Sequence, residues 1–485
     1  MRSARSGPPG GGEADQDDDD AAVSLRAPAA IVAQVTGAFL SELPAGLAIT
    51  DADLLEGFRR DRSAAAEPGR PLALAQPTST AEVSLLLRAA SRHRVPVVPR
   101  GAGTGLSGGA NAIDGCLILS LAKMDRILEI DAENAVAVVQ PGLLNGALKL
   151  ATSEQGLWYA PDPSSFEICS IGGNLATNAG GLRCMSLGIT RQHVLGAEVV
   201  LASGEVMRLG GRTIKRRAGY DLLSLFIGSE GTLGVTTEAT LRLRPRPVVE
   251  SVALAAFPTI EGAGRAVIAI TRSRLRVVAL ELMDDVTVAA LEAWKPYGLD
   301  TTAAATLLVE LESATPADLD ALREICAHEG APEVMNAETP QEQEWLMAGR
   351  RAAIVALEAR GATIIDDVIV PRTRIPDLFR LTRQASARHG LAVAVFGHAG
   401  DGNFHPTIVY DRADPAALVR AMTVADELMR AAIALGGSIT GEHGVGVLKK
   451  HLLAEELDPQ ALALMRRIKT LLDPAGILNP GKAIV

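Results

Sequence analysis

Hydrophobic positions recur along the chain with two periods, which predict its helices and strands. Within 77–94, apolar residues fall at helical spacing and predict an amphipathic helix. Ser79 followed by Glu82 matches a capping box at its start. The apolar run 95–99 then predicts a short buried strand.

From 116 to 245 the pattern favours β-structure. Short apolar runs such as "CLILSL", "RILEID" and "AVAVVQPG" are separated by turn residues, and 194–209 predicts a hairpin turning at Ser203-Gly204. A helix is expected near 143–155. The segment 159–181 predicts a long irregular stretch.

Beyond Pro245 and Pro247 the pattern changes to alternating strands and helices, which predicts a separate α+β domain. The last helix ends at Asp473-Pro474, and an extended terminus follows. We therefore expect four segments: a disordered acidic tail (1–25), a first domain (26–247), a second α+β domain (248–440) and a C-terminal segment (441–485).

Composition narrows the function classes. A net charge of −10 argues against nucleic acid and anionic membranes as partners. The cysteines Cys116, Cys169, Cys184 and Cys326 lack CxxC spacing, so they predict reduced thiols in a cytoplasmic protein. The sequence has no apolar run long enough to span a membrane and no targeting peptide, so neither is expected.

The stretch "VPRGAGTGLSGGAN" (98–111) contains GxGxxG at Gly103-Thr-Gly105-Leu-Ser-Gly108. In a dinucleotide fold this motif leads from a strand into a helix. Here "GGANAIDGCLILSL" continues into another strand. Glu129 and Asp131 stand at the distance of a ribose-binding acid, but no βαβ pattern surrounds them. The sequence therefore argues against a Rossmann site.

Two further glycine clusters, 171–181 and 228–235, lie in the same β-rich region. Glycines let a phosphate approach backbone N–H groups closely. A single cluster is as typical of a surface loop as of a site. Three clusters together predict a large phosphate-bearing ligand lying across the domain.

The motifs "PVVPRGAGTGLSGG", "GGNLATNAGGLRCMSLGIT", "GSEGTLGVTTEATLRLRP" and "DPAGILNPGK" resemble FAD-linked 2-hydroxy-acid dehydrogenases of the vanillyl-alcohol-oxidase type. Glycolate oxidase flavin subunits and D-lactate dehydrogenases are the most similar members. The resemblance runs from about residue 70 to the C-terminus. It implies an α+β fold: a two-subdomain PCMH-type FAD-binding domain, an α+β cap domain over the substrate, and a C-terminal return to the FAD domain.

The resemblance also implies the residues that line FAD. They are Arg100, Gly101, Gly103, Thr104, Gly105, Ser107, Gly108, Gly109, Pro141, Gly142, Pro161, Asp162, Ser165, Gly172, Gly173, Asn174, Asn178, Gly180, Gly181, Glu230, Gly231, Val235, Asn479 and Lys482. The first loop carries Thr104 and neither His nor Cys, so we expect non-covalent FAD. His193 and Cys184 are less favoured as points of linkage.

Three of the eight histidines lie in "GHAGDGNFHP" (397–406) and "TGEHGVG" (440–446). A four-residue hairpin loop, 400–403, makes His398 and His405 a directly opposed cross-strand pair. Glu442, in a glycine-flanked turn, adds a carboxylate. This set suits a divalent metal, with Zn²⁺ favoured. A polar pair bonded in a core is the alternative; non-haem Fe(II) fits the ligands too but leaves the glycine loops unexplained.

In the resembling family, His398, His405 and Glu442 match metal ligands, and His443 matches a residue beside the substrate hydroxyl. A metal lowers the hydroxyl pKa, a neutral His removes the proton, and hydride passes from Cα to the flavin. His398 or a metal-bound species could exchange this role with His443. Arg350 matches the position that binds the substrate carboxylate, with Arg351 and a solvated helix arginine as alternatives.

The expected function is oxidation of a small D-2-hydroxy acid, D-lactate or glycolate, to the 2-oxo acid. Where D-2-hydroxyglutarate dehydrogenases carry a Lys and an Asn, this chain has Ile365 and Thr407. Both differences favour a monocarboxylate. D-2-hydroxyglutarate oxidation and a catalytically idle FAD subunit of a larger complex remain alternatives. The electron acceptor, a homodimer or partner subunits, and a peripheral place at the inner membrane face are left open.

Overall fold

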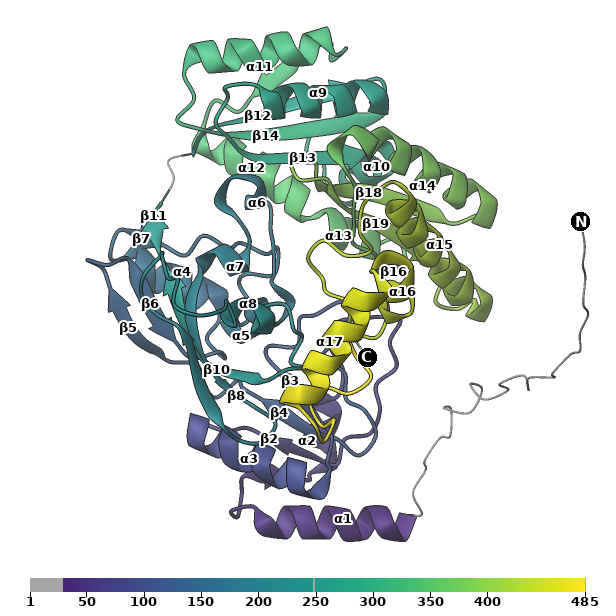
Figure 1. The fold of residues 1–485 in the computed structure, drawn as a ribbon. Coiled ribbons are helices and arrows are strands. Elements are labelled where there is room, and N and C mark those ends of the chain that lie inside the picture. The colour runs from purple at the N-terminus through teal and green to yellow at the C-terminus, as the bar shows by residue number, and fades with distance from the viewer. Residues whose placement is uncertain (1–28, 247–248, 485) are drawn as a thin grey trace, which may run out of the picture.

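The computed structural model describes residues 29–246 and 249–484. The predicted acidic tail, 1–25, lies outside the described residues, as do residues 247 and 248 at the predicted domain boundary. In Figure 1 the elements up to β11 (Arg244–Pro245) fill the lower part of the molecule, whereas β12 (Val249–Phe257) to α15 (Pro415–Ala434) fill the upper part. The domain limits themselves stay a prediction.

The lower part begins with a sheet that carries the first glycine loop. Its order is β1 (Ala48–Ile49), β2 (Ala73–Ala75), β4 (Leu117–Ser120), β3 (Val97–Arg100), and β4 is parallel to both of its neighbours. Helix α3 (Thr80–His93) packs its apolar face on this sheet. Ser79 accepts the Glu82 N–H at 3.3 Å, as its predicted capping role requires.

A second sheet packs beside the first. Its order is β5 (Ile127–Asp131), β6 (Val136–Val139), β10 (Val235–Arg242), β8 (Val194–Val200), β9 (Val206–Gly210). Buried and half-buried residues alternate along β10, as in a strand with one face on a core. The predicted hairpin joins β8 to β9, where Gly204 has φ +82°. A short pair, β7 (Leu157–Trp158) with β11, lies next to it.

Part of the stretch predicted to be irregular is a helix, α5 (Ile171–Thr177). Ser170 caps it by accepting the Gly173 N–H, and Asn178 ends it in the left-handed conformation at φ 53°. Gly172 and Gly173 weaken the helical signal, which is why the pattern missed it. The remaining helices of the lower part are α1 (Ala29–Glu42), α2 (Ala52–Phe58), α4 (Asn145–Ser153), α6 (Cys184–Leu187), α7 (Thr190–His193) and α8 (Leu223–Phe226).

The upper part is built on a largely antiparallel sheet. Its order is β15 (Val334–Asn336), β12, β14 (Ala305–Glu312), β13 (Val277–Asp284), β18 (Ala392–His398), β19 (Asn403–Tyr410), β16 (Ala362–Ile365), with β17 (Val368–Ile369) also on β19. Its helices are α9 (Ile260–Arg272), α10 (Asp285–Trp294), α11 (Pro316–His328), α12 (Pro340–Arg351), α13 (Ala353–Glu358), α14 (Ile375–His389) and α15. Helix α15 was not among the predicted helices.

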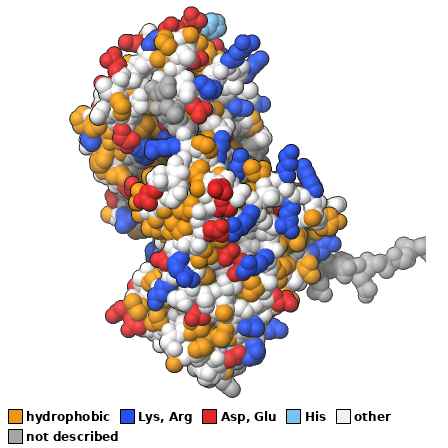
Figure 2. Space-filling view, turned by 90° about the vertical axis from the view of Figure 1, so that its left-hand side faces the viewer, with side chains coloured by type: hydrophobic (Ala, Val, Ile, Leu, Met, Phe, Trp, Pro, Cys, Tyr) orange, Lys and Arg blue, Asp and Glu red, His pale blue; other side chains and the backbone are white. Residues whose placement is uncertain are grey.

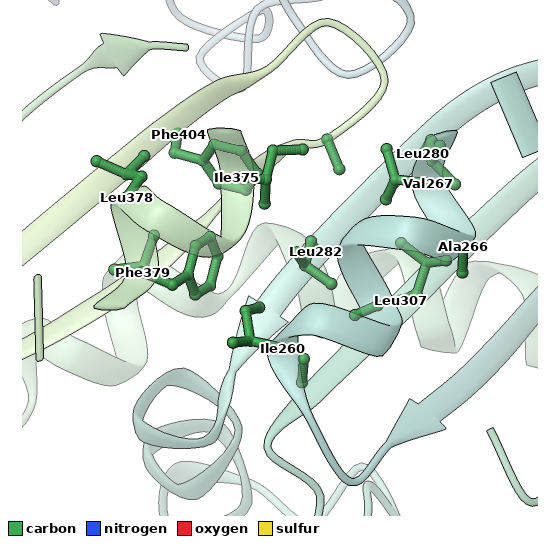
Figure 3. Close-up of a cluster of buried hydrophobic side chains, with 14 of the residues drawn as sticks. Ile260, Ala266, Val267, Leu280, Leu282, Leu307, Ile375, Leu378, Phe379 and Phe404 are labelled. Carbon is green, nitrogen blue, oxygen red and sulfur yellow. The ribbon is translucent and has the colours of Figure 1, made fainter. Parts of the chain in front are cut away.

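Figure 3 shows the core of this upper part. Helix α9 lies over β13 and β14, and α14 packs beside it against β19. The Phe379 and Phe404 rings meet edge to face, with centroids 5.1 Å apart. This packing fixes β13, β18 and β19, the strands that carry the histidine cluster.

The C-terminal segment returns to the lower part, as the fold class predicts. After the 3₁₀ turn Lys450–Leu452, α16 (Leu453–Glu456) and α17 (Pro459–Leu472), yellow in Figure 1, lead back toward β3. Leu478 then bridges to Val97 in parallel. Asp473 ends α17 and accepts the N–H groups of Ile477 and Leu478, which fixes this return.

The surface mixes charges of both signs. On the face turned to the viewer in Figure 2, acidic and basic side chains are interspersed without a single-sign patch. Across residues 29–246 and 249–484, no helix combines the length and the apolar character that crossing a bilayer demands.

Candidate active site

The three glycine clusters meet at a cavity of about 1120 Å³. This volume stands at the upper end for ligand pockets, which fits a dinucleotide-sized cofactor with a small substrate. The predicted FAD residues that line it are Arg100, Gly101, Gly103, Thr104, Gly105, Ser107, Gly109, Ser165, Gly172, Gly173, Asn174, Gly180, Glu230, Gly231 and Val235. Sequence positions far apart are thus brought to one ligand-sized space.

The other predicted FAD residues are not in the lining: Gly108, Pro141, Gly142, Pro161, Asp162, Asn178, Gly181, Asn479 and Lys482. Several brace the lining from behind. Asn479 Nδ2 and Lys482 Nζ each donate to the Gly109 carbonyl at 3.0 Å. The Pro141 carbonyl accepts the Gly172 N–H at 2.7 Å.

The loop after β3 behaves as the sequence predicts. Within residues 101–116 no helix intervenes, and the chain enters β4, parallel and adjacent to β3. Ser107 joins this loop to the histidine-bearing turn, since its hydroxyl donates to the Gly444 carbonyl at 2.9 Å and its carbonyl accepts the Val447 N–H at 2.9 Å. The glycine loop and the residues beyond Thr440 therefore form one wall.

The histidines converge on one carboxylate oxygen. Oε1 of Glu442 lies 3.6 Å from Nε2 of His398, 3.4 Å from Nε2 of His405 and 3.9 Å from Nε2 of His443. Glu442 and His443 line the cavity, whereas His398 and His405 stand behind them, 6% and 5% exposed. The predicted metal ligands and the predicted base are thus adjacent.

The strand register of the histidine pair was predicted wrongly. His398 pairs with Asn403 and Phe396 pairs with His405, so the four-residue loop is 399–402 and the histidines are diagonal neighbours. Moving the turn by one residue changes the pairing between the strands by two positions. Because side chains alternate between the two faces with a period of two, both histidines stay on the same face. Their ring centroids are 5.3 Å apart, so the two side chains converge although the predicted pairing was wrong.

Two buried carboxylates face the far nitrogens of these histidines. Oε1 of Glu281, on β13, lies 2.7 Å from Nδ1 of His398. Oδ1 of Asp367, between β16 and β17, lies 3.8 Å from Nδ1 of His405. Metal-binding histidines commonly direct their second nitrogen to such a carboxylate, which leaves Nε2 as the ligand atom.

Neither carboxylate was predicted as a site residue. A signal for Glu281 was available, because it is a charge inside the otherwise apolar run "VVALELM". Asp366 and Asp367 interrupt "IIDDVIV" in the same way.

The electrostatics follow from this burial. Burial works to lower the pKa of His398, but the Glu281 carboxylate outweighs it and holds the pKa well above the usual range. Burial and the neighbouring His443 lower the pKa of His405 to about 3. Against burial, the hydrogen bond and charge of His398 lower the pKa of Glu442 to about 2. The metal-free cluster therefore holds a proton on His398 and a charge on Glu442.

Among the described residues, two sets of three side chains place their ligand atoms within 4.8 Å of one another: His398, His405 and Glu442, and Asp367, His405 and His443. In the second set, Oδ2 of Asp367 already accepts four donors. The first set has two imidazoles and a carboxylate, and the buried Glu281 and Asp367 face the second ring nitrogens of the two imidazoles. Its donors fit a divalent metal with open positions.

Arg350 is paired with a buried carboxylate behind the cavity. Its Nη2 lies 2.7 Å from Oε2 of Glu281, and its guanidinium covers the Phe396 ring at 4.9 Å. It is 6% exposed and is not in the cavity lining. Arg351, the alternative, pairs with Glu344 instead.

Other elements complete the cavity. Residues 60–65 and Glu67, in the connection between α2 and β2, line one side. Ile354, Ile365 and Tyr410 line the side formed by the upper part. Nε2 of His193 donates to the Leu187 carbonyl, 2.8 Å away, and neither His193 nor Cys184 is in the lining.

Comparisons with known proteins agree with this arrangement. A family model described as "FAD linked oxidases, C-terminal domain" matches residues 246–483, and one described as "FAD binding domain" matches 71–210. Glycolate oxidase subunit GlcD of Bacillus subtilis is 41% identical over 416 residues, covering 85% of this chain and 88% of that protein. The chain belongs to the FAD-linked oxidases.

Further relatives support the same family. D-lactate dehydrogenase of Anaerostipes hadrus is 36% identical over 442 residues, covering 89% of this chain and 93% of that protein. Among solved structures, p-cresol methylhydroxylase with substrate bound superposes with a TM-score of 0.78 at 19% identity, covering 94% of this chain and 98% of that one. The 4-ethylphenol oxidase from Gulosibacter chungangensis gives 0.75 at 22%, covering 95% and 98%.

These findings confirm the predicted family, the PCMH-type FAD-binding fold and FAD as the cofactor. This FAD-linked oxidase is an enzyme that carries out FAD-linked oxidation.

Proposed function

We propose that this FAD-linked oxidase converts a small D-2-hydroxy acid, D-lactate or glycolate, to the 2-oxo acid with the help of a divalent metal, Zn²⁺ by preference. One observation carries the proposal: the cavity lined by the glycine loops is also lined by Glu442 and His443. A substrate there contacts the FAD side and the histidine cluster together.

In this proposal the roles divide among a few side chains. When bound, the flavin accepts hydride and the cation acts as a Lewis acid on the substrate hydroxyl and carboxylate. His398, His405 and Glu442 hold the cation. His443 lines the cavity 3.9 Å from the Glu442 carboxylate, which supports it as the group that accepts the hydroxyl proton. His398, tied to Glu281, is less suited to that role.

Arg350 is the proposed partner of the substrate carboxylate. Arg350 matches the family's carboxylate-binding position, yet its Nη2 pairs with Glu281. A guanidinium has five N–H donors, and Nε of Arg350 has no partner among the described residues. We propose that Arg350 turns this free edge to the substrate while it keeps Glu281 ionised beside His398.

The cavity wall favours a small substrate with one carboxylate. Ile354 and Ile365 line the cavity with apolar side chains, and Ile365 stands where D-2-hydroxyglutarate dehydrogenases carry a Lys. Thr407 is fully buried and donates to the His405 carbonyl at 3.2 Å. D-2-hydroxyglutarate is the alternative substrate, and a catalytically idle FAD subunit is the alternative from another class.

The relatives' names support the proposals on partners. One relative is named as a subunit of glycolate oxidase and another as D-lactate dehydrogenase. We propose that the protein works with partner subunits or an electron acceptor. We propose a cytoplasmic location, which can be peripheral to the membrane through that acceptor. We also propose that FAD is bound non-covalently. The domain limits 26–247, 248–440 and 441–485 belong to the same proposal.

The test is anaerobic reduction of the flavin. Purified protein should release FAD on acid denaturation and bleach with D-lactate or glycolate, but not with L-lactate. His398→Ala and Glu442→Ala should keep the flavin and lose the bleaching. Preferential bleaching by D-2-hydroxyglutarate favours the dicarboxylate alternative. Bound FAD and metal without reduction by any hydroxy acid favours the idle subunit.

A further inference from the structure

A short turn, residues 440–446, carries both the third proposed metal ligand and the proposed base. It follows α15 and has the sequence "TGEHGVG". Such a glycine-rich turn has many backbone conformations, so its composition does not place Glu442 and His443. Contacts to other parts of the chain must do so.

One buried oxygen gathers the first half of this turn. Oδ2 of Asp367 accepts the backbone N–H groups of Gly441, Glu442 and His443 at 3.0, 2.9 and 2.8 Å. It also accepts the Thr440 hydroxyl at 2.8 Å. Successive N–H groups converging on one oxygen form a nest, an arrangement that proteins use to bind anions. Here the anion is a carboxylate of the same chain.

The same carboxylate faces the other ligands. Oδ1 of Asp367 accepts from Nδ2 of Asn403, at 2.7 Å, and lies 3.8 Å from Nδ1 of His405. Asp367 is fully buried, and Nζ of Lys449 is 4.0 Å from its Oδ2. A single side chain therefore contacts the backbone of Glu442 and His443 and stands behind the ring of His405.

The second half of the turn is fixed from the other part of the molecule. Glu230, in the third glycine cluster, accepts the N–H groups of Val445 and Gly446 at 2.7 and 2.8 Å. Because Asp367 and Glu230 hold opposite halves, the role of Asp367 can be tested while the turn stays attached through Glu230.

We infer that Asp367 is a positioning residue for the metal site: its carboxylate organises the 440–443 backbone so that Glu442 and His443 converge with His405. The inference rests on the proposed metal-dependent function. An amide at this position keeps one acceptor oxygen, which can serve either the converging 440–443 donors or Nδ2 of Asn403 but not both, and it leaves His405 without a charged partner. The ligand geometry then loosens even though every ligand is present.

The test compares Asp367→Asn with Asp284→Asn in the full-length, FAD-loaded protein. Asp284 is a matched control because it is a buried aspartate of the same sheet that accepts the N–H groups of Thr287 and Val395. For each variant, Zn²⁺ affinity is measured by chelator competition, and the visible spectrum of the Co²⁺-loaded protein reports ligand geometry. FAD content and the melting temperature report folding.

We expect Asp367→Asn to retain FAD and to change the Co²⁺ spectrum. Its Zn²⁺ affinity should fall about 10–100-fold, which is the usual effect of removing a side chain that orients a metal ligand. Asp284→Asn should keep both metal readouts even where its melting temperature falls. Thr440→Val, a milder change, should shift both metal readouts in the same direction by less, and serves if Asp367→Asn fails to fold.

Wild-type affinity and an unchanged Co²⁺ spectrum in Asp367→Asn, or in Thr440→Val if the first variant does not fold, overturn the inference. Equal losses in the Asp284→Asn control overturn it too, since they assign the effect to general loosening of the sheet. Wild-type protein that binds no Zn²⁺ refutes the proposed function itself, which is a different result from metal binding that is indifferent to Asp367.

Discussion

The contact of Glu281 with His398 leads to a quantitative prediction for Glu281→Gln. Glu281 is fully buried, with His398 Nδ1 and Arg350 Nη2 each 2.7 Å from one of its oxygens. The amide keeps the size of the side chain and removes its charge. Two separate costs follow: Arg350 becomes an unpaired buried cation, and the acceptor that orients the His398 ring loses its charge.

The two costs have different magnitudes and different readouts. Breaking a buried ion pair by removing one partner destabilises a protein by about 3–5 kcal/mol. Loss of an outer-shell partner lowers metal affinity about 10–100-fold, or about 1.4–2.7 kcal/mol. A second change, Arg350→Met, removes the stranded cation and keeps an apolar contact with the Phe396 ring. The double variant should therefore recover most of the stability and none of the metal affinity.

The assay pairs thermal or urea unfolding, followed by circular dichroism, with Zn²⁺ affinity from chelator competition. Turnover is unsuitable here, because Arg350 is also the proposed partner of the substrate carboxylate. Recovery of wild-type Zn²⁺ affinity in the double variant would refute the reasoning, since Glu281 would then act through Arg350 and not through the orientation of His398.

Three further predictions concern other contacts. Because Glu281 holds the pKa of His398 well above its usual range, a metal that binds His398 must displace a proton, so Zn²⁺ affinity should rise with pH through neutrality. Calorimetry in buffers of different ionisation enthalpy should detect this proton release. Zn²⁺ binding without proton release contradicts the prediction. Gly180→Ala places a Cβ 2.5 Å from Oε2 of Glu442, so bleaching by D-lactate or glycolate should fall while FAD stays bound, and unchanged rates count against the assigned site. Arg183 pairs with the buried Asp162 and Glu310, so Arg183→Met should lower the free energy of unfolding, measured in urea, by about 3–5 kcal/mol. A change below about 1 kcal/mol would show that these ion pairs contribute little to stability.

Much of the fold followed from local pattern. Ser79 caps α3 as predicted, and the β8–β9 hairpin turns at Ser203-Gly204. These features depend on side-chain periodicity and turn chemistry within a few residues, which the sequence carries directly. Helix α5 escaped detection because its glycines lower helix propensity and only the packed tertiary structure favours it.

The chemistry of the site was partly readable in the same way. The motifs around His398, His405 and Glu442 identified candidate ligands, and the structure brings them together. The predicted opposition of His398 and His405 was wrong, because loop length alone does not place a turn along two strands. The pairing differs from the predicted one by two positions, so His398 and His405 still lie on the same face of the sheet and still converge.

By itself the sequence determined the family, the cofactor and the residue types available for catalysis, because these are written in contiguous motifs. The tertiary structure decided which groups surround them. Glu281 faces His398 from 117 residues away, and Asp367 holds His443 from 76 residues away. Pairings over such separations depend on strand order and on buried charges finding partners, and neither is visible in a local pattern.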